Sequence, residues 1–260
     1  MFNMKVFLAE FIGTFALVFV GAGAGIVNAG LVGIALAHGF TLAVFAYVYG
    51  HISGSHVNPA VTFGLALNGT IKWGQAIFYW IAQFAGAILA AFLLKTMLTA
   101  VDPTLTIKAG ATVGALTDKA PVLAMIVEAI LTFFLVNTIL HTAVDGKGGP
   151  FAGWAIGTTL AFAILVGGPF TGASLNPART LGPAIFSTPS ITSVYTYVIY
   201  FLGPLLGSTF AVLMFKFFTG TEEDLDLDEV IEEDDVIIEE EVIPVKEKKP
   251  AVRKMAQKEN

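Results

Sequence analysis

The sequence predicts an all-α membrane protein in which six transmembrane helices and two half-length helices form an inverted repeat. Composition gives the first reason, because a mean hydropathy of +0.77 and 13% charged residues over 260 positions are far from the composition of a soluble domain. Six long apolar stretches give the second. The third is a short motif that occurs twice and starts a helix inside apolar sequence each time.

A transmembrane helix needs about 20 mostly apolar residues. The stretches that approach this length are about 7–28, 33–51, 75–98, 121–141, 151–168 and 195–218. The first has no basic region followed by a small-residue cleavage site, so we expect it to be retained as a span.

The repeated motif reads SGSHVNPA at 53–60 and TGASLNPA at 171–178. In each copy Asn occupies a helix N-cap and Pro the first helical position. These residues are Asn58, Pro59 and Ala60 in the first copy and Asn176, Pro177 and Ala178 in the second. About ten residues follow each Asn before a helix breaker, which gives about 15 Å of helix, half a bilayer.

An offset of 118 residues relates the two halves: it joins Asn58 to Asn176 and also Glu10 to Glu128. We therefore predict a duplication, with one repeat at about 5–100 and the other at about 121–218. Each contains three full spans, an odd number, so the second runs through the membrane in the opposite sense. The two half-helix N-termini then meet near the midplane. Irregular backbone at that depth is tolerated where it lines a water-filled cavity, which predicts a pore.

Arg179, Glu10 and Glu128 are charged residues within predicted membrane segments. Arg179 breaks the repeat, because Val61 occupies the matching position. Such a charge is functional by default, and the alternative is an Arg that extends to the membrane interface. Glu10 and Glu128 are either a proton-relay pair or structural supports for the loops. Asn58 and Asn176, in turn, could be helix caps and nothing more.

The segments HISGSHVNPAVT and GASLNPARTLGPA resemble the paired signature of the aquaporin (major intrinsic protein) family, together with AEFIGTF in the first span. The resemblance covers about residues 5–218. It implies a six-span channel with two half-helices, usually a homotetramer with one pore per subunit in a lipid bilayer. It implies neither a cofactor nor a metal, and no nucleic acid partner.

Family resemblance also implies which residues form the pore. Its constriction falls on His38, Ile164, Ala173 and Arg179, a set similar to that of plant vacuolar aquaporins, which pass water and in several members ammonia, hydrogen peroxide or urea. His38 could alternatively be a hydrogen-bonded histidine between helices. In the family Glu10 and Glu128 bond to the half-helix loops, and we expect His51 to brace the first loop. Glycerol facilitators typically carry other residues at the positions of Thr180, Ala184, Tyr200 and Phe201.

Each pore Asn has a side-chain oxygen to cap its helix and an amide to donate to water. The helix N-termini add about half a positive charge each, which disfavours cations. Loop carbonyls would supply a ladder of acceptors. These belong to Gly54, Ser55, His56, Val57, Gly172, Ala173, Ser174 and Leu175.

The charge distribution separates a channel domain, 1–220, from a tail, 221–260, that is acidic and then basic. We expect a disordered cytoplasmic tail, either solvated or binding a partner. Lysines near the span ends favour cytoplasmic termini in the cell membrane. The chain has no cysteine, which excludes disulfides and thiolate chemistry.

These observations predict a passive channel for water that excludes protons and ions and passes some small neutral solutes. The main alternative is an ammonia or hydrogen peroxide channel that also conducts water. A glycerol facilitator and a non-conducting membrane scaffold are less favoured. An enzyme is least favoured, because the sequence has no nucleophile motif, metal cluster or phosphate loop.

Overall fold

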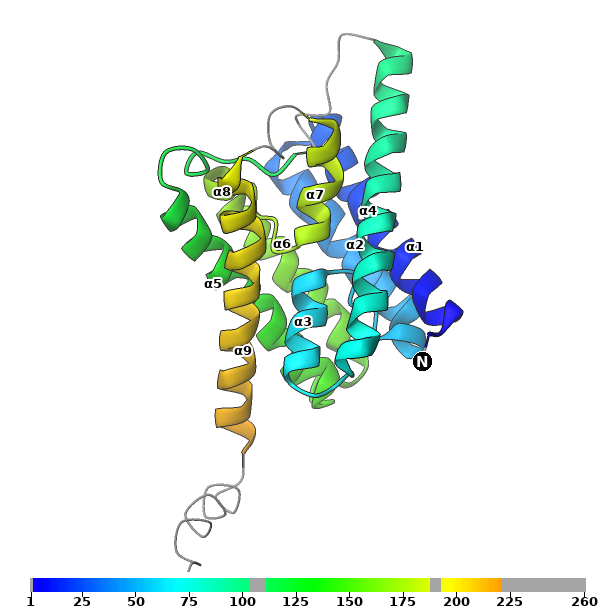
Figure 1. The fold of residues 1–260 in the computed structure, drawn as a ribbon, viewed down its shortest axis with the longest axis vertical. Helices are drawn as coiled ribbons and strands as arrows, with labels where there is room; N and C mark the ends of the chain where they lie inside the picture. The colour runs from blue at the N-terminus through cyan, green and yellow to red at the C-terminus, as the bar shows by residue number, and fades with distance from the viewer. Residues whose placement is uncertain (1, 103–110, 188–192, 221–260) are drawn as a thin grey trace, which may run out of the picture. The chain divides into compact units, whose positions relative to one another are not determined.

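The computed structural model describes residues 2–102, 111–187 and 193–220. Residues Met1–Thr219 form one compact unit, and the tail expected at 221–260 lies outside the described residues. All regular structure in the described part is helical, and Figure 1 shows how the helices are arranged. They are α1 (Met4–Ile26), α2 (Gly30–Ser53), α3 (Pro59–Leu67), α4 (Trp73–Val101), α5 (Pro121–Ile139), α6 (Ala152–Thr171), α7 (Pro177–Phe186), α8 (Val194–Tyr197) and α9 (Gly203–Thr219).

Short irregular turns extend three of these helices. A π-helical turn, Leu140–Val144, continues α5, and another, Val198–Leu202, joins α8 to α9. A 3-10 turn, Gly149–Phe151, precedes α6. With these turns included, six helical stretches of the described residues are long and apolar enough to cross a membrane, and they match the six predicted spans: Met4–Ile26, Gly30–Ser53, Trp73–Val101, Pro121–Val144, Gly149–Thr171 and Val194–Thr219. The predicted fold class is confirmed.

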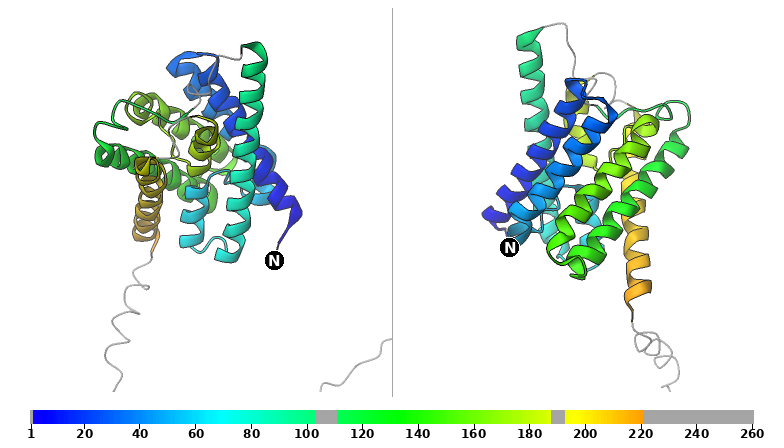
Figure 2. Two further views of the ribbon diagram at one scale, coloured as in Figure 1. Left: turned by 45° about the horizontal axis from the view of Figure 1, so that its top comes forward. Right: turned by 180° about the vertical axis from the view of Figure 1, so that it is seen from behind.

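Glycines let the long helices approach closely in mirrored pairs. A Cβ added to Gly39 on α2 would lie 2.6 Å from the Gly157 carbonyl oxygen on α6, and one added to Gly157 would lie 2.4 Å from the Gly39 carbonyl oxygen. Gly86 on α4 meets α1 in the same way, and Gly207 on α9 meets α5. Small residues at such crossings are typical of membrane helix packing. Figure 2 shows α1 beside α2 and α5 beside α6.

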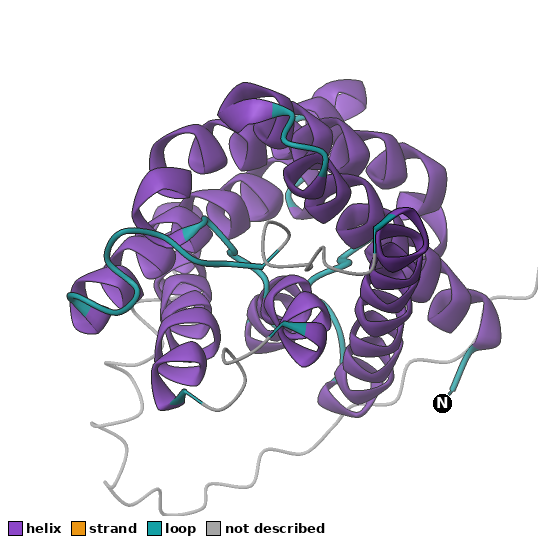
Figure 3. Ribbon diagram, turned by 90° about the horizontal axis from the view of Figure 1, so that it is seen from above, coloured by secondary structure: helices purple, strands orange, loops and turns teal. Residues whose placement is uncertain are grey.

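The half-helices α3 and α7 lie one below the other in Figure 1, and their N-terminal ends approach each other. Each follows a chain reversal at the end of a full span. Gly54 ends α2 with a φ of 83°, and Gly172 ends α6 with a φ of 82°, a left-handed conformation that glycine adopts without strain. Figure 3 shows the loops converging in the region that the helices surround.

Candidate functional site

Both half-helices begin with the expected asparagine caps. The Oδ1 atom of Asn58 accepts a hydrogen bond from the backbone N–H of Ala60 at 2.8 Å. Asn176 Oδ1 accepts from the N–H groups of Ala178 and Arg179 at 3.0 and 3.1 Å. These bonds orient both asparagine side chains, so that each amide nitrogen points away from its own helix.

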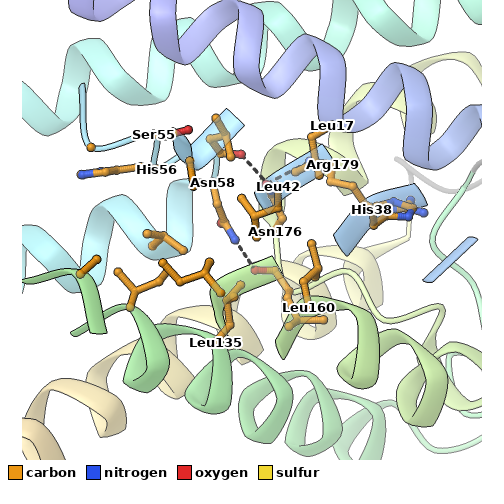
Figure 4. Close-up of a pocket in the computed structure, with 18 of the residues that line it drawn as sticks. Leu17, His38, Leu42, Ser55, His56, Asn58, Leu135, Leu160, Asn176 and Arg179 are labelled. Carbon is orange, nitrogen blue, oxygen red and sulfur yellow. Dashed lines mark hydrogen bonds between the residues drawn. The ribbon is translucent and has the colours of Figure 1, made fainter. Parts of the chain in front are cut away.

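Each asparagine amide binds the opposite half of the molecule. Asn58 Nδ2 donates to the Leu175 carbonyl oxygen at 2.8 Å, and Asn176 Nδ2 donates to the Val57 carbonyl oxygen at 2.9 Å (Figure 4). An amide carries two hydrogens, so each asparagine keeps a second donor. The Val57 and Leu175 carbonyls, which the sequence assigned to the acceptor ladder, each use a lone pair on this cross-half contact.

Glu10 organises the loop between α2 and α3. Its side chain is fully buried and accepts four hydrogen bonds, a pattern that suits an ionised carboxylate. The donors are Ser53 Oγ at 2.6 Å, the His56 N–H at 2.9 Å, the Val57 N–H at 2.7 Å and Gln83 Nε2 at 2.8 Å. Tyr79 completes the support, because its hydroxyl donates to the Ser53 carbonyl at 2.7 Å.

Glu128 supports the second loop with three contacts that match those of Glu10 at the 118-residue offset. It is fully buried and accepts from Thr171 Oγ1 at 2.6 Å, the Ser174 N–H at 3.0 Å and the Leu175 N–H at 2.8 Å. The Tyr200 hydroxyl donates to the Thr171 carbonyl at 2.7 Å. Three of the four donors to Glu10 therefore have a counterpart at the 118-residue offset, whereas Gln83 does not, because Phe201 occupies the matching position.

These bonds hold the two loops in a strained backbone. Ser55 and Val57 have φ angles of 50° and 44°, and Ala173 and Leu175 have φ angles of 44° and 54°. Residues other than glycine seldom adopt this region, and a β-branched residue such as Val57 seldom does so at all. Such strain persists where the surroundings fix it, and it concentrates at functional sites.

A narrow cavity runs past both asparagines. The volume open to the centres of water molecules is about 40 Å³, enough for about three waters at 10–15 Å³ each. Many of its residues form pairs at the 118-residue offset. It is lined by Leu17, His38, Leu42, Ala46, Gly54, Ser55, His56, Val57, Asn58, Val61, Leu65, Leu135, Ile139, Ala143, Ile156, Leu160, Ser174, Leu175, Asn176 and Arg179.

Arg179 and His38 lie at one end of this cavity, on the far side of the asparagines from His56 (Figure 4). An Arg179 terminal nitrogen, Nη1, donates to Thr112 Oγ1 at 3.0 Å. His38 Nδ1 lies 2.9 Å from the Ile34 carbonyl oxygen, which only accepts, so Nδ1 carries the hydrogen and Nε2 is an acceptor in the neutral ring. The ring fits only because residue 21 is glycine, where a Cβ would lie 2.3 Å from Nε2.

Several residues expected at the site are not part of the cavity lining. Ile164 and Ala173 are buried but do not line the cavity. Gly172 packs against the segment before α5, since a Cβ there would lie 2.7 Å from the Val113 nitrogen. The expectation that His51 braces the first loop is wrong, because His51 is exposed. Ser53 and Tyr79 support the first loop instead. Residues 51 and 53 are two positions apart on α2, so their side chains point to nearly opposite faces of the helix.

Sequence reasoning missed the segment between α4 and α5. Thr112 binds both Arg179 and the Thr180 hydroxyl, the latter at 3.0 Å, and Thr117 lies 2.9 Å from the Tyr200 hydroxyl. Isolated threonines in a loop carry no periodicity, so no pattern in the sequence marks them. The described residues contain no group of three or more histidine or acidic side chains arranged to hold a metal.

Two mirrored half-helices that meet at paired asparagines beside a narrow cavity define a membrane channel of the inverted-repeat class. The family model of the Major intrinsic protein family matches residues 1–215. The chain belongs to the major intrinsic protein family, whose members include the aquaporins.

Individual relatives agree with this assignment. The chain is 42% identical over 229 residues to "Probable aquaporin TIP2-2" of Oryza sativa, covering 83% of this chain and 87% of the relative. It is 42% identical over 213 residues to "Glycerol uptake facilitator protein-like 6" of Lactiplantibacillus plantarum, covering 80% and 95%. The crystal structure of the aquaglyceroporin from Plasmodium falciparum superposes with a TM-score of 0.71 at 25% identity, covering 86% of this chain and 98% of that one. The protein is thus a multi-pass membrane channel of the aquaporin type and not an enzyme.

Proposed function

We propose that this channel conducts water down an osmotic gradient and excludes protons and ions. The observation that carries the proposal is the pair of asparagines beside the narrow cavity. Each has one amide hydrogen committed to the opposite half and one left to donate to a passing water. Apolar pairs such as Leu17 with Leu135 and Leu42 with Leu160 line much of the remaining wall. A water molecule then exchanges few hydrogen bonds at a time, in single file.

Electrostatics supports the exclusion of cations. The N-termini of α3 and α7 each contribute about half a positive charge next to Asn58 and Asn176. Arg179 adds a guanidinium at one end of the cavity. The carboxylates of Glu10 and Glu128 do not line the cavity, and their hydrogen bonds go to the loops. This placement favours structural support over a proton relay.

The proposal also covers the passage of small neutral solutes other than water. Of the four residues expected at the constriction, His38 and Arg179 line the cavity and carry the proposed selectivity. His38 Nε2 is buried and has no hydrogen-bond partner among the described residues, so an acceptor is available to ammonia or hydrogen peroxide. A channel for these solutes that also conducts water is therefore the second candidate. Glycerol is a further candidate solute, because one relative is named a glycerol uptake facilitator. Thr180 and Ala184, however, differ from the residues that glycerol facilitators typically carry at these positions.

The proposal extends to assembly and location. We propose a homotetramer with one pore per subunit, residing in the cell membrane with both termini in the cytoplasm. The described lysines near span ends favour this orientation, with Lys5, Lys72, Lys147 and Lys216 on one side and Lys95 and Lys119 on the other.

Purified full-length protein in liposomes tests these proposals. We expect shrinkage in an impermeant osmolyte to be faster than in empty liposomes, with slower entry of glycerol and urea. Internal pH during an ammonium gradient reports ammonia, and a membrane potential reports ion leakage. Water flux equal to that of empty liposomes would leave only the non-conducting scaffold. Ammonia flux that rises without water flux would favour the second candidate.

A further inference from the structure

The repeat gives the constriction a mirror image on the other side of the asparagines. Subtracting the 118-residue offset from Arg179, Ile164 and Ala173 leads to the first half, and adding it to His38 leads to the second. All four mirrored residues line the cavity: Val61, Ala46, Ser55 and Ile156. By contrast, only Arg179 and His38 of the original four do so.

The cavity changes width near these residues. Its narrow part, with about 40 Å³ open to water, meets a wide vestibule with about 660 Å³. Ala46 and Ile156 line both spaces, whereas Ser55 and Val61 line only the narrow one. Ala46 and Ile156 therefore stand where the narrow cavity opens, with Ser55 and Val61 inside its narrow part. Ser55 lies across Asn58 and Asn176 from His38 (Figure 4).

Ser55 is the one mirrored residue whose side chain is able to form a hydrogen bond, since the other three are aliphatic. It is 6% exposed, and its Oγ atom has no hydrogen-bond partner among the described residues. A buried hydroxyl without a partner is destabilising, and most find one. The Ser55 backbone is itself fixed, with a φ of 50° and its N–H bound to Ser53 Oγ at 3.0 Å. A molecule passing through the cavity would satisfy this hydroxyl.

We propose that Ala46, Ser55, Val61 and Ile156 form a second constriction, where the Ser55 hydroxyl hydrogen-bonds each permeating water or other small neutral molecule. The proposal rests on the proposed channel function and adds a specificity residue to it. This constriction carries no charge in its side chains, unlike the one at Arg179. It selects by width and by a single hydroxyl.

Ser55→Ala tests the hydrogen bond in full-length protein reconstituted in liposomes. Loss of one hydrogen bond lowers the water permeability per channel about two- to tenfold and steepens its temperature dependence. The direction of the change in water permeability distinguishes a hydrogen bond from a purely steric effect. Alanine is smaller than serine, so a constriction that acted only by its width would conduct water as fast or faster. Thr132→Val is the matched control: Thr132 is also buried with no partner for its hydroxyl among the described residues, but it does not line the cavity. We expect its water flux to be unchanged.

Ser55→Cys tests the placement independently. The chain contains no cysteine, so this variant has a single thiol. We expect mercuric ion to block its water flux and a reducing thiol to restore it, while wild type and Thr132→Cys resist. The idea fails if Ser55→Ala conducts water at the wild-type rate or faster, or if Ser55→Cys conducts and is insensitive to mercuric ion. Wild-type protein that does not conduct would instead overturn the channel proposal.

Discussion

Replacing Glu10 with glutamine isolates the contribution of the buried carboxylate to the channel. The new side chain has nearly the same shape but exchanges one acceptor oxygen for an NH₂ donor. The Ser53 hydroxyl can rotate to accept from that group, whereas a backbone N–H cannot. In either amide orientation, one of the N–H groups of His56 and Val57, now 2.9 and 2.7 Å from the carboxylate, faces another donor.

One buried donor left unsatisfied costs about 1–3 kcal/mol. At about 2–4 °C per kcal/mol for a chain of this size, the apparent melting temperature of Glu10→Gln in detergent should fall by about 2–12 °C. Water flux per channel should fall as well, because the lost bond frees a backbone that is strained at Val57. Thermal unfolding and stopped-flow light scattering of proteoliposomes measure the two effects.

Glu128→Gln provides the mirrored comparison. Its N–H donors come from Ser174 and Leu175, so the same reasoning gives the same range. Asp145→Asn is the control, since among the described residues Asp145 forms an ion pair with Lys147 near the surface, at 3.6 Å, and such pairs contribute about 0–1 kcal/mol. Melting temperatures within 1 °C of wild type for both glutamine variants, with normal water flux, would refute the role assigned to the carboxylates.

Three further changes probe the asparagines and the Arg179 end. Asn176→Asp keeps the helix cap but removes the donor to the Val57 carbonyl, at a cost of about 1–3 kcal/mol; its negative charge should also admit cations, measured as potential-driven leakage from liposomes. Arg179→Val, which copies Val61, should raise urea and glycerol entry, and unchanged entry would remove Arg179 as a size filter. His38→Phe removes an acceptor and should lower ammonia or peroxide flux more than water flux; proportional losses would contradict a selective role.

Patterns repeated in the sequence predicted much of the fold. Asn58 and Asn176 with their prolines locate both half-helices, because capping chemistry is local. The 118-residue offset then implies the inverted arrangement and the matched positions of Glu10 and Glu128. Both inferences need only chain order and the thickness of a membrane.

Contacts between residues that are distant along the chain could not be predicted from the sequence. Tyr79 and Tyr200 support the loops at a spacing of 121 residues, which a search at 118 misses. Thr112 reaches Arg179 from a loop whose path depends on packing against Gly172. His51 is exposed and Ser53 is buried. Which of the two faces the loop depends on where the last turn of α2 begins, and composition does not determine this.

The crossed bonds of the asparagines also bear on how the chain folds. While only the first half has been synthesised, the Asn58 amide has no Leu175 carbonyl to bind, and the Val57 carbonyl has no Asn176. Asn58 and Val57 are buried in the folded protein, and a buried polar group without a partner is costly. Membrane insertion of the second half therefore completes the first, and the centre of the channel is among the last parts of the protein to form.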